Sequence, residues 1–473
     1  MAKDRATASE FHSFKDWAEQ QFGQTQLGDK RRTARAVRLG AALAANPDAS
    51  LPTQTQHWSQ LKAAYRFLAQ EKVTHSALTE PHRLNIKKQA ETKNGVVLFV
   101  QDTTELDFSS HTNTQELGHI GDTKGRGFVV HTCLAIVPDE VAPEVMGLAQ
   151  QVVWTRETII KGTETRSQRN KRRTEADIWA ETLEQIGAVP EKNPSLWVSV
   201  GDRGSDIISY VQRARHLNWH CLIRVYQNRV IFKPESSFSE RLLTCLRALE
   251  TVTSKQITLR GRDGLPKRTV TLKIAWQEAR LQIPAINSCK DPVSGWYVRC
   301  WENSEDKDAL EWILFTTLPI ESSDTAKEIL SWYAHRWLIE EYHKCLKTGC
   351  SMEDRQLHRG SALKALLGFL SLVSLRLLQL RWLSHQQPDR PALEVVPALW
   401  LELLRARTDF SSDSVAAWSV STFWRHLAQL GGFIGRKSDG SPGWQTLWRG
   451  WFRFQDMLWA ASWVTSEESQ KCG

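Results

Sequence analysis

The sequence predicts an α/β protein in which helical regions flank a central sheet. Short apolar runs such as VVLFVQ (96–101) and LWVSVG (196–201) are typical of buried strands. Helical periodicity fills residues 8–75 and returns at 324, and the helix-forming segment TEADIWAETLEQI (174–186) lies between strands. Strands first, followed by strand–helix alternation, favour the α/β class over an all-helical or all-strand protein.

Size and charge place the chain among soluble globular proteins. Its 473 residues allow two to four domains, and 41% hydrophobic with 24% charged residues is an ordinary composition. The 61 lysines and arginines exceed the 53 acidic residues and give a net charge of +8. This mild excess suits a polyanionic partner, but it is equally compatible with a protein that binds no nucleic acid.

The apolar segments do not predict a membrane protein. The first residues, MAKDRATASEFHSF, contain no apolar stretch of the kind found in secretory signals. The most apolar run (363–380) is interrupted by Lys364 and Arg376, so we expect a buried core helix. Eight scattered cysteines without a C-x-x-C pair indicate reduced thiols in a cytoplasmic protein.

The N-terminal residues predict a small helical module with a basic side. Asp29 is expected to cap a helix that opens KRRTARAVR, and Arg66 lies on a later helix. The arginines of the capped helix gather around one side: Arg31, Arg32, Arg35 and Arg38. Arginines leading a helix suit contacts with the DNA backbone, and a solvated helix face is the alternative.

Two later regions have a character of their own. Residues 227–321 read as alternating strands separated by Gly, Pro and Asp, which predicts a β-rich insertion. Before it, the basic stretch RSQRNKRR (166–173) is either a DNA-facing loop or a solvated one. Near the C-terminus a tryptophan-rich helix has one apolar face, which either packs on the chain's own core or forms a dimer. That face comprises Trp444, Leu447, Trp448, Trp451, Gln455 and Leu458.

Two aspartates stand out by position. Asp102 directly follows VVLFVQ, with TTELDF as the next expected strand, and Asp202 directly follows LWVSVG. Sites in α/β proteins are built at strand ends, and carboxylates held there can bind Mg²⁺ or Mn²⁺. Each aspartate could instead cap the next turn, but the matched pair favours a metal site.

The stretch AHRWLIEEYHKCLKTG (334–349) offers the third carboxylate. At about 100° per residue, a group of polar side chains falls within an arc of roughly 80°: Tyr333, Arg336, Glu340, Lys344 and Lys347. Glu341 lies off the centre of this arc and is expected to pair with a nearby base. The opposite side is apolar: Leu338, Ile339, Tyr342 and Leu346. A Glu340–Lys344 pair at i,i+4 is the structural alternative, but it leaves the additional cations unexplained.

These residues carry a family resemblance. Tyr333-x2-Arg336-x3-Glu340-x6-Lys347 resembles the Y-R-E-K signature of the insertion-sequence-four family of bacterial DDE transposases. The resemblance extends to QDTT (101–104), GDRGSDI (201–207), LGDKRRTARAV and AAYRF near the N-terminus, and LGGFIGRKSDGSPGW near the C-terminus. It spans nearly the whole chain in the expected order.

The resemblance implies a fold and a set of site residues. The fold is a ribonuclease-H-like catalytic core with a β-strand insertion, flanked by an N-terminal helical DNA-binding domain and a C-terminal helical region. Asp102, Asp202 and Glu340 would form the triad that holds two Mg²⁺ or Mn²⁺ ions. The implied contacts with the transposon end are Tyr333, Arg336, Lys344 and Lys347, with Trp312 stacking on a flipped base, and Arg31, Arg32, Arg35 and Arg66 reading the end sequence.

The resemblance also implies a domain order and partners. The expected parts are a DNA-binding domain (1–77), a catalytic core (78–223 and 322–385) divided by the insertion (224–321), and a dimerisation region (386–473) that includes the tryptophan-rich helix. The partners would be double-stranded DNA, both transposon ends and target, and a second copy of the chain in a synaptic homodimer. The expected location is the bacterial cytoplasm, at the nucleoid.

The implied reaction is cut-and-paste transposition. Metal-activated water nicks one strand, the freed 3′-hydroxyl attacks the opposite strand to give a hairpin, water opens the hairpin, and the 3′-hydroxyl then joins target DNA. One carboxylate triad can serve every step, because each is an in-line displacement at phosphorus. A catalytically silent DNA-binding regulator of transposition is the alternative, and a nuclease without strand transfer is a third possibility.

Overall fold

The computed structural model describes residues 14–471, except 56, 123, 140–141, 157–172, 233–238, 260–267, 285–288, 305–308, 408–413 and 437–438. Its first elements are helices: α1 (Phe14–Phe22), α2 (Lys30–Ala45), α3 (Leu51–Thr55), α4 (Trp58–Leu68) and α5 (His75–Thr92). The expected cap of α2 is confirmed, since the Asp29 side chain accepts a hydrogen bond from the Arg31 backbone N–H.

The strands of the described residues form one mixed sheet in the order β2-β3-β1-β5-β6-β12-β11-β10-β7-β8, with β4 on β3 and β9 on β10. The first strands along the chain are β1 (Gly95–Asp107), β2 (Gly118–Ile120), β3 (Gly125–Val137), β4 (Glu144–Trp154) and β5 (Ser195–Gly201). β1 is antiparallel to β3 and parallel to β5, and β5 is parallel to β6 (His220–Arg224). The α/β class is therefore confirmed.

The predicted β-rich insertion continues this sheet. Its strands are β7 (Val230–Phe232), β8 (Ser239–Arg241), β9 (Thr253–Leu259), β10 (Arg268–Leu281), β11 (Val293–Glu302) and β12 (Glu311–Thr316), with α9 (Leu242–Arg247) among them. β12 joins the core because it pairs antiparallel with β6. The insertion is thus continuous with the sheet formed by the preceding strands, while the domain boundaries named above stay predictions.

Helices cover both faces of the sheet, as the alternation along β1 requires. Leu98 and Val100 belong to one apolar cluster and Val97 and Phe99 to another, because successive side chains of a strand point to opposite faces. The second cluster includes residues of α7 (Asp177–Ile186) and α8 (Ile208–His216). The first includes residues of α10 (Ser323–Ala334), α11 (Trp337–Lys344) and α12 (Gly360–Gln386).

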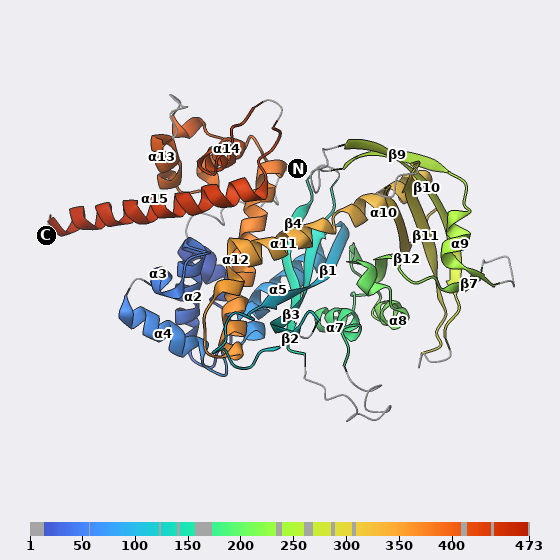
Figure 1. Cartoon of the computed structure of the whole chain (residues 1–473), viewed down its shortest axis with the longest axis horizontal. Helices are drawn as coiled ribbons and strands as arrows, with labels where there is room; N and C mark the ends of the chain where they lie inside the picture. The colour runs from blue at the N-terminus through green and yellow to red at the C-terminus, as the bar shows by residue number, and fades with distance from the viewer. Residues whose placement is uncertain are drawn as a thin grey trace.

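Helix α12 is the central support of the fold. It lies between the N-terminal helices and the sheet (Figure 1). By length and composition it could span a membrane, but 89% of its most apolar window is buried inside the protein. The prediction of a buried core helix is confirmed. Phe369 on α12 contacts Phe22 and Phe67 of the N-terminal helices, with ring centroids 4.8 and 6.3 Å apart.

The C-terminal helices cover the tryptophan-rich face within the same chain. They are α13 (Ala398–Arg407), α14 (Val420–Leu430) and α15 (Trp444–Lys471). On α15, Trp444, Trp448 and Trp451 are buried, and Trp451 packs edge-on against Trp400 of α13. Of the two readings of this face, packing on the chain's own core is therefore correct for its described side chains. The dimerisation role expected for residues 386–473 stays a prediction.

Truncating the α12 anchor should destabilise the fold. Phe369→Ala is expected to lower the free energy of unfolding by about 3–5 kcal/mol, because the buried ring leaves a cavity between α12 and the N-terminal helices. Leu84→Ala on α5 is the matched control, since Leu84 is 61% exposed and should cost less than about 0.5 kcal/mol. Urea denaturation measures both, and equal effects would contradict the central position of α12.

Candidate active site

Asp102 lies within β1, and Asp202 directly follows the parallel strand β5. The last paired residues of β1 and β5 are Val100 and Val200, so each aspartate comes two positions after its strand's last paired residue. The expected strand break at Asp102 is wrong: β1 runs on to Asp107, because β3 continues to pair with it, and Asp102 lies opposite Thr132. The parallel register nevertheless brings the two carboxylates together.

Asp202 has the capping role that was considered for it. It directly follows β5 and caps the short 3-10 turn Arg203–Ser205, since its Oδ1 accepts a hydrogen bond from the Gly204 N–H at 2.8 Å. The cap therefore fixes one oxygen of the carboxylate and orients the side chain. The negative charge of Asp202 helps to raise the pKa of Asp102.

The third carboxylate comes from a helical segment that is interrupted twice. α10 ends at Ala334, α11 spans Trp337–Lys344, and a π-helical turn follows at Cys345–Gly349. The predicted apolar back is confirmed, because all four of its side chains are fully buried: Leu338, Ile339, Tyr342 and Leu346. Glu340 is on the open side, with its side chain 56% exposed.

The polar arc is only partly as predicted. Tyr333, Arg336, Glu340 and Lys344 line one cavity of about 680 Å³. Lys347 is not among its lining residues, and pairs with Glu353 at 3.3 Å instead. The arc assumed a uniform α-helix, whereas the wider π-turn after Lys344 changes the direction of every later side chain.

Arg336 joins two of the carboxylates. Its Nη1 lies 3.4 Å from Asp102 Oδ2, and its Nη2 donates a hydrogen bond to Glu340 Oε1. Burial and the charge of Asp202 raise the pKa of Asp102 to about 6, and Glu340 adds to the rise, while Arg336 and the Thr103 N–H oppose it. The three acidic groups therefore form one electrostatic unit around a guanidinium.

Glu341 has a structural partner, as expected from its place off the arc. Its Oε1 lies 3.3 Å from Nη1 of Arg381 on α12, and both side chains are buried. Arg381 in turn lies over the ring of Trp444, 4.0 Å from its centroid. The choice of Glu340 over Glu341 as the exposed carboxylate of α11 agrees with this geometry.

Trp312 and Tyr333 form an aromatic wall of the cavity. Trp312, on β12, is partly exposed and meets Tyr333 edge-on at 5.3 Å between ring centroids. Tyr333 is buried, its hydroxyl has no hydrogen-bond partner among the described residues, and burial raises its pKa. This wall leaves an apolar surface beside the carboxylates.

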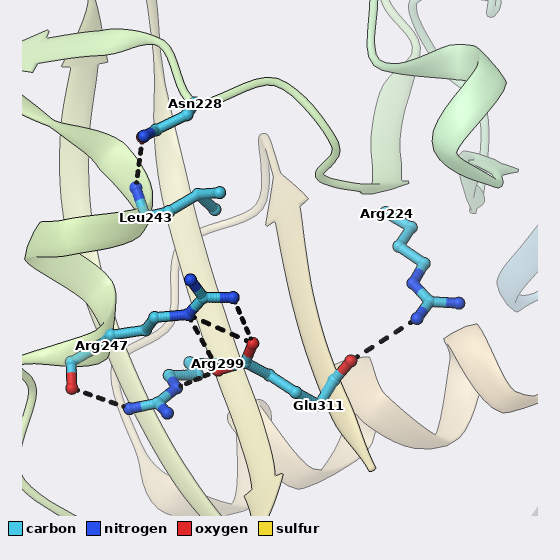
Figure 2. Close-up of polar contacts among 6 residues, drawn as sticks. All are labelled: Arg224, Asn228, Leu243, Arg247, Arg299 and Glu311. Carbon is cyan, nitrogen blue, oxygen red and sulfur yellow. Dashed lines mark hydrogen bonds and ion pairs between the residues drawn. The ribbon is translucent and has the colours of Figure 1, made fainter. Parts of the chain in front are cut away.

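Two cationic residues of the same cavity were not predicted. Arg224 ends β6, one position beyond the residue paired with Gly201, and Lys255 comes from β9. Figure 2 shows Arg224 contacting the backbone oxygen of Glu311, whose side chain pairs with Arg247 and Arg299. The sequence did contain a signal for Arg224, which is a basic residue at the end of the strand that follows β5 and α8. It contained no signal for Lys255, because the position of the β9–β10 hairpin beside α10 depends on tertiary contacts.

The basic residues of the N-terminal module lie apart from this cavity. Arg31 is 94% exposed and Arg66 is exposed, whereas Arg32 and Arg35 donate hydrogen bonds within the module to Leu27 O, Gln70 Oε1 and Gln60 Oε1. Helix α12 separates these helices from β1 (Figure 1). Residues 166–172 of the predicted basic loop lie outside the described residues, and Arg173 pairs with Glu181.

The donor chemistry of the carboxylates fits a hard divalent cation. Carboxylate oxygens are the preferred ligands of Mg²⁺ and Mn²⁺, and the guanidinium between Asp102 and Glu340 shows that a positive charge is favourable there. Within the described ranges, however, no three His, Cys, Asp or Glu side chains converge closely enough to hold a metal as they stand. A cation would have to replace the Arg336 contacts.

Two family models match the chain. Residues 14–73 match the family described as "Transposase DNA-binding", and residues 156–376 match the "Transposase DDE domain". The second range contains Asp202 and Glu340, and Asp102 lies before it. The DDE match implies a ribonuclease-H-like core. With a transposase DNA-binding domain followed by a DDE domain, the chain belongs to the DDE transposases, enzymes with nuclease and strand-transferase activity.

Proposed function

We propose that this transposase moves a bacterial insertion sequence by cut-and-paste transposition, with Asp102, Asp202 and Glu340 as its catalytic triad. The observation that carries the assignment is the coupling of the three carboxylates, two of them bridged by Arg336 and the third raising the pKa of Asp102. Repelling carboxylates held together are costly in a fold and are typical of functional sites.

Two divalent cations, Mg²⁺ or Mn²⁺, would be held by these three carboxylates, where they would activate the attacking oxygen and stabilise the leaving one. The protein's own contribution is positional. Asp202 is oriented by its bond from Gly204, and Asp102 is held by the β-sheet and by the Thr103 N–H. Arg336 neutralises Asp102 and Glu340 until the site is loaded.

The cavity beside the triad would hold the DNA end. Arg336 and Lys344, with Arg224 and Lys255, line it with positive charge suited to phosphates. Trp312 offers a face for a flipped base, a contact worth about 1–3 kcal/mol, and Tyr333 would contact a phosphate once a movement of the site exposes its buried hydroxyl. Lys347 would contact DNA away from this cavity, after release from Glu353.

The N-terminal helices would recognise the transposon end. The exposed residues Arg31 and Arg66 are placed to contact phosphates or bases. On α4, Arg66 is accompanied by the exposed Trp58 and by Lys62, which lies 5.2 Å from the Trp58 ring centroid. Arg32 and Arg35 would act by holding the module in shape, or would exchange their internal bonds for DNA contacts.

The remaining assignments follow from the family resemblance. We place the enzyme in the insertion-sequence-four family and in the bacterial cytoplasm at the nucleoid, and we expect a homodimer to join two transposon ends. Because the described tryptophan face of α15 is already covered, the dimer would use other surfaces of residues 386–473.

Replacing each of the two adjacent glutamates in turn by glutamine should separate an effect on catalysis from an effect on stability. Glu340→Gln is expected to reduce Mg²⁺-dependent nicking of end DNA by more than the roughly 10–100-fold loss typical of a lost outer-shell partner, with end binding and folding unchanged, because the side chain is largely exposed. Glu341→Gln, the matched control, should retain nicking but lose about 3–5 kcal/mol of stability, because the buried ion pair with Arg381 is broken.

Gel assays of nicking and binding, with urea denaturation, measure both effects. Retained nicking in Glu340→Gln would sink the assignment. A wild-type protein that binds end DNA but never nicks it with Mn²⁺ would favour the silent regulator, and nicking without joined products in a plasmid assay would favour a nuclease.

The raised pKa of Asp102 predicts a pH-dependent stability. Its folded-state pKa of about 6 exceeds the ordinary 3.8, so the ionised form costs the fold free energy as pH rises through that window. Asp102→Asn should therefore stabilise the metal-free protein by up to about 3 kcal/mol at about pH 8, and by less at about pH 5. Urea denaturation with a chelator present tests this, and a destabilised variant at the higher pH would contradict the repulsion.

A further inference from the structure

Three consecutive residues of α11 are each bound to a different part of the core. Glu341 pairs with Arg381 of α12, the Tyr342 hydroxyl donates to the Ser371 backbone oxygen at 3.2 Å, and His343 Nε2 lies 3.1 Å from the Thr132 hydroxyl. All three are buried. The residues on either side of them, Glu340 and Lys344, line the cavity.

Thr132 links this helix directly to the carboxylate strand. It lies on β3 opposite Asp102 in the antiparallel register, and it is fully buried. His343 therefore ties the helix that carries Glu340 to the residue next to Asp102. Burial lowers the pKa of His343 to about 3, so the ring is neutral and the contact is a hydrogen bond rather than an ion pair.

Gln151 on β4 extends the same network. Its Nε2 donates to Thr132 at 2.9 Å and to the Tyr342 hydroxyl at 3.2 Å. Its Oε1 accepts from the Ser371 hydroxyl at 2.6 Å and contacts His75 Nε2 of α5 at 2.8 Å. Two neighbouring residues of α11 thus converge, through buried bonds, on one threonine.

Because α11 is short, its rotation about its own axis depends on these hydrogen bonds. The helix has 8 residues, begins after a break at His335–Arg336 and runs into a π-turn, so no long regular helix sets its rotation. A rotation of about 100°, one residue, would turn Glu340 away from Asp102 and Glu341 away from Arg381. It would also leave buried polar groups unpaired, at about 1–3 kcal/mol each.

We propose that Thr132 and Gln151 are positioning residues of the transposase, which lock the rotation of α11 through Tyr342 and His343 so that Glu340 meets Asp102 and Asp202. The proposal rests on the proposed function, in which Glu340 binds the cation. It assigns a role to buried residues outside the Y-R-E-K signature. They touch neither substrate nor metal, and they act only through the direction of the Glu340 side chain.

Thr132→Val tests the lock, because it keeps the shape of the side chain and removes the hydroxyl. We expect Mn²⁺ to bind the full-length variant roughly 10–100-fold more weakly, as measured by calorimetric titration with the metal alone. Thr132→Ser should restore binding. Thr182→Val on α7 is the matched control, since Thr182 is equally buried and its hydroxyl donates to the Ile178 backbone oxygen of its own helix.

A combined variant separates positioning from general destabilisation. In a Glu340→Gln background, Thr132→Val should weaken Mn²⁺ binding no further, because the carboxylate that it positions is absent. Wild-type Mn²⁺ affinity in Thr132→Val, an equal loss in Thr182→Val, or a full further loss in the combined variant would each overturn the proposal. Unchanged affinity in Glu340→Gln alone would instead overturn the proposed function beneath it.

Discussion

The parallel pairing of β1 with β5 brings two acidic side chains together, and the catalytic half of the structure is arranged around the resulting repulsion. Asp102 and Asp202 follow equivalent positions of paired strands, and Glu340 approaches from α11. Arg336 offsets the accumulated charge by contacting Asp102 and Glu340 at once. Under the proposed function a divalent cation would replace the guanidinium between the carboxylates, and the same arginine would then be available to a phosphate.

Helix α12 transmits this arrangement to the rest of the chain. One side packs against the N-terminal DNA-binding helices through Phe369, and another holds α11 through Arg381 and Ser371. The N-terminal DNA-binding helices and helix α11, which carries Glu340, are therefore both fixed to the buried helix α12. The buried network through Gln151 adds β3, β4 and α5 to this frame.

Local patterns predicted many of the elements and which glutamate of α11 is exposed. LWVSVG ahead of Asp202 is a strand, and helical spacing alone distinguished Glu340 from Glu341. What failed depended on features beyond local periodicity. Asp102 lies within a strand because β3 continues to pair with it, and Lys347 leaves the arc because of a π-turn. No periodicity in the sequence encodes those partners.

The most direct test of the account is the position of Mn²⁺ in crystals of the enzyme with end DNA, located by anomalous scattering. The account predicts metal peaks bound by oxygens of Asp102, Asp202 and Glu340, with Arg336 withdrawn from Glu340 and facing a phosphate. Peaks that involve Glu341, or an Arg336 that keeps both carboxylates while the metal binds elsewhere, would contradict it.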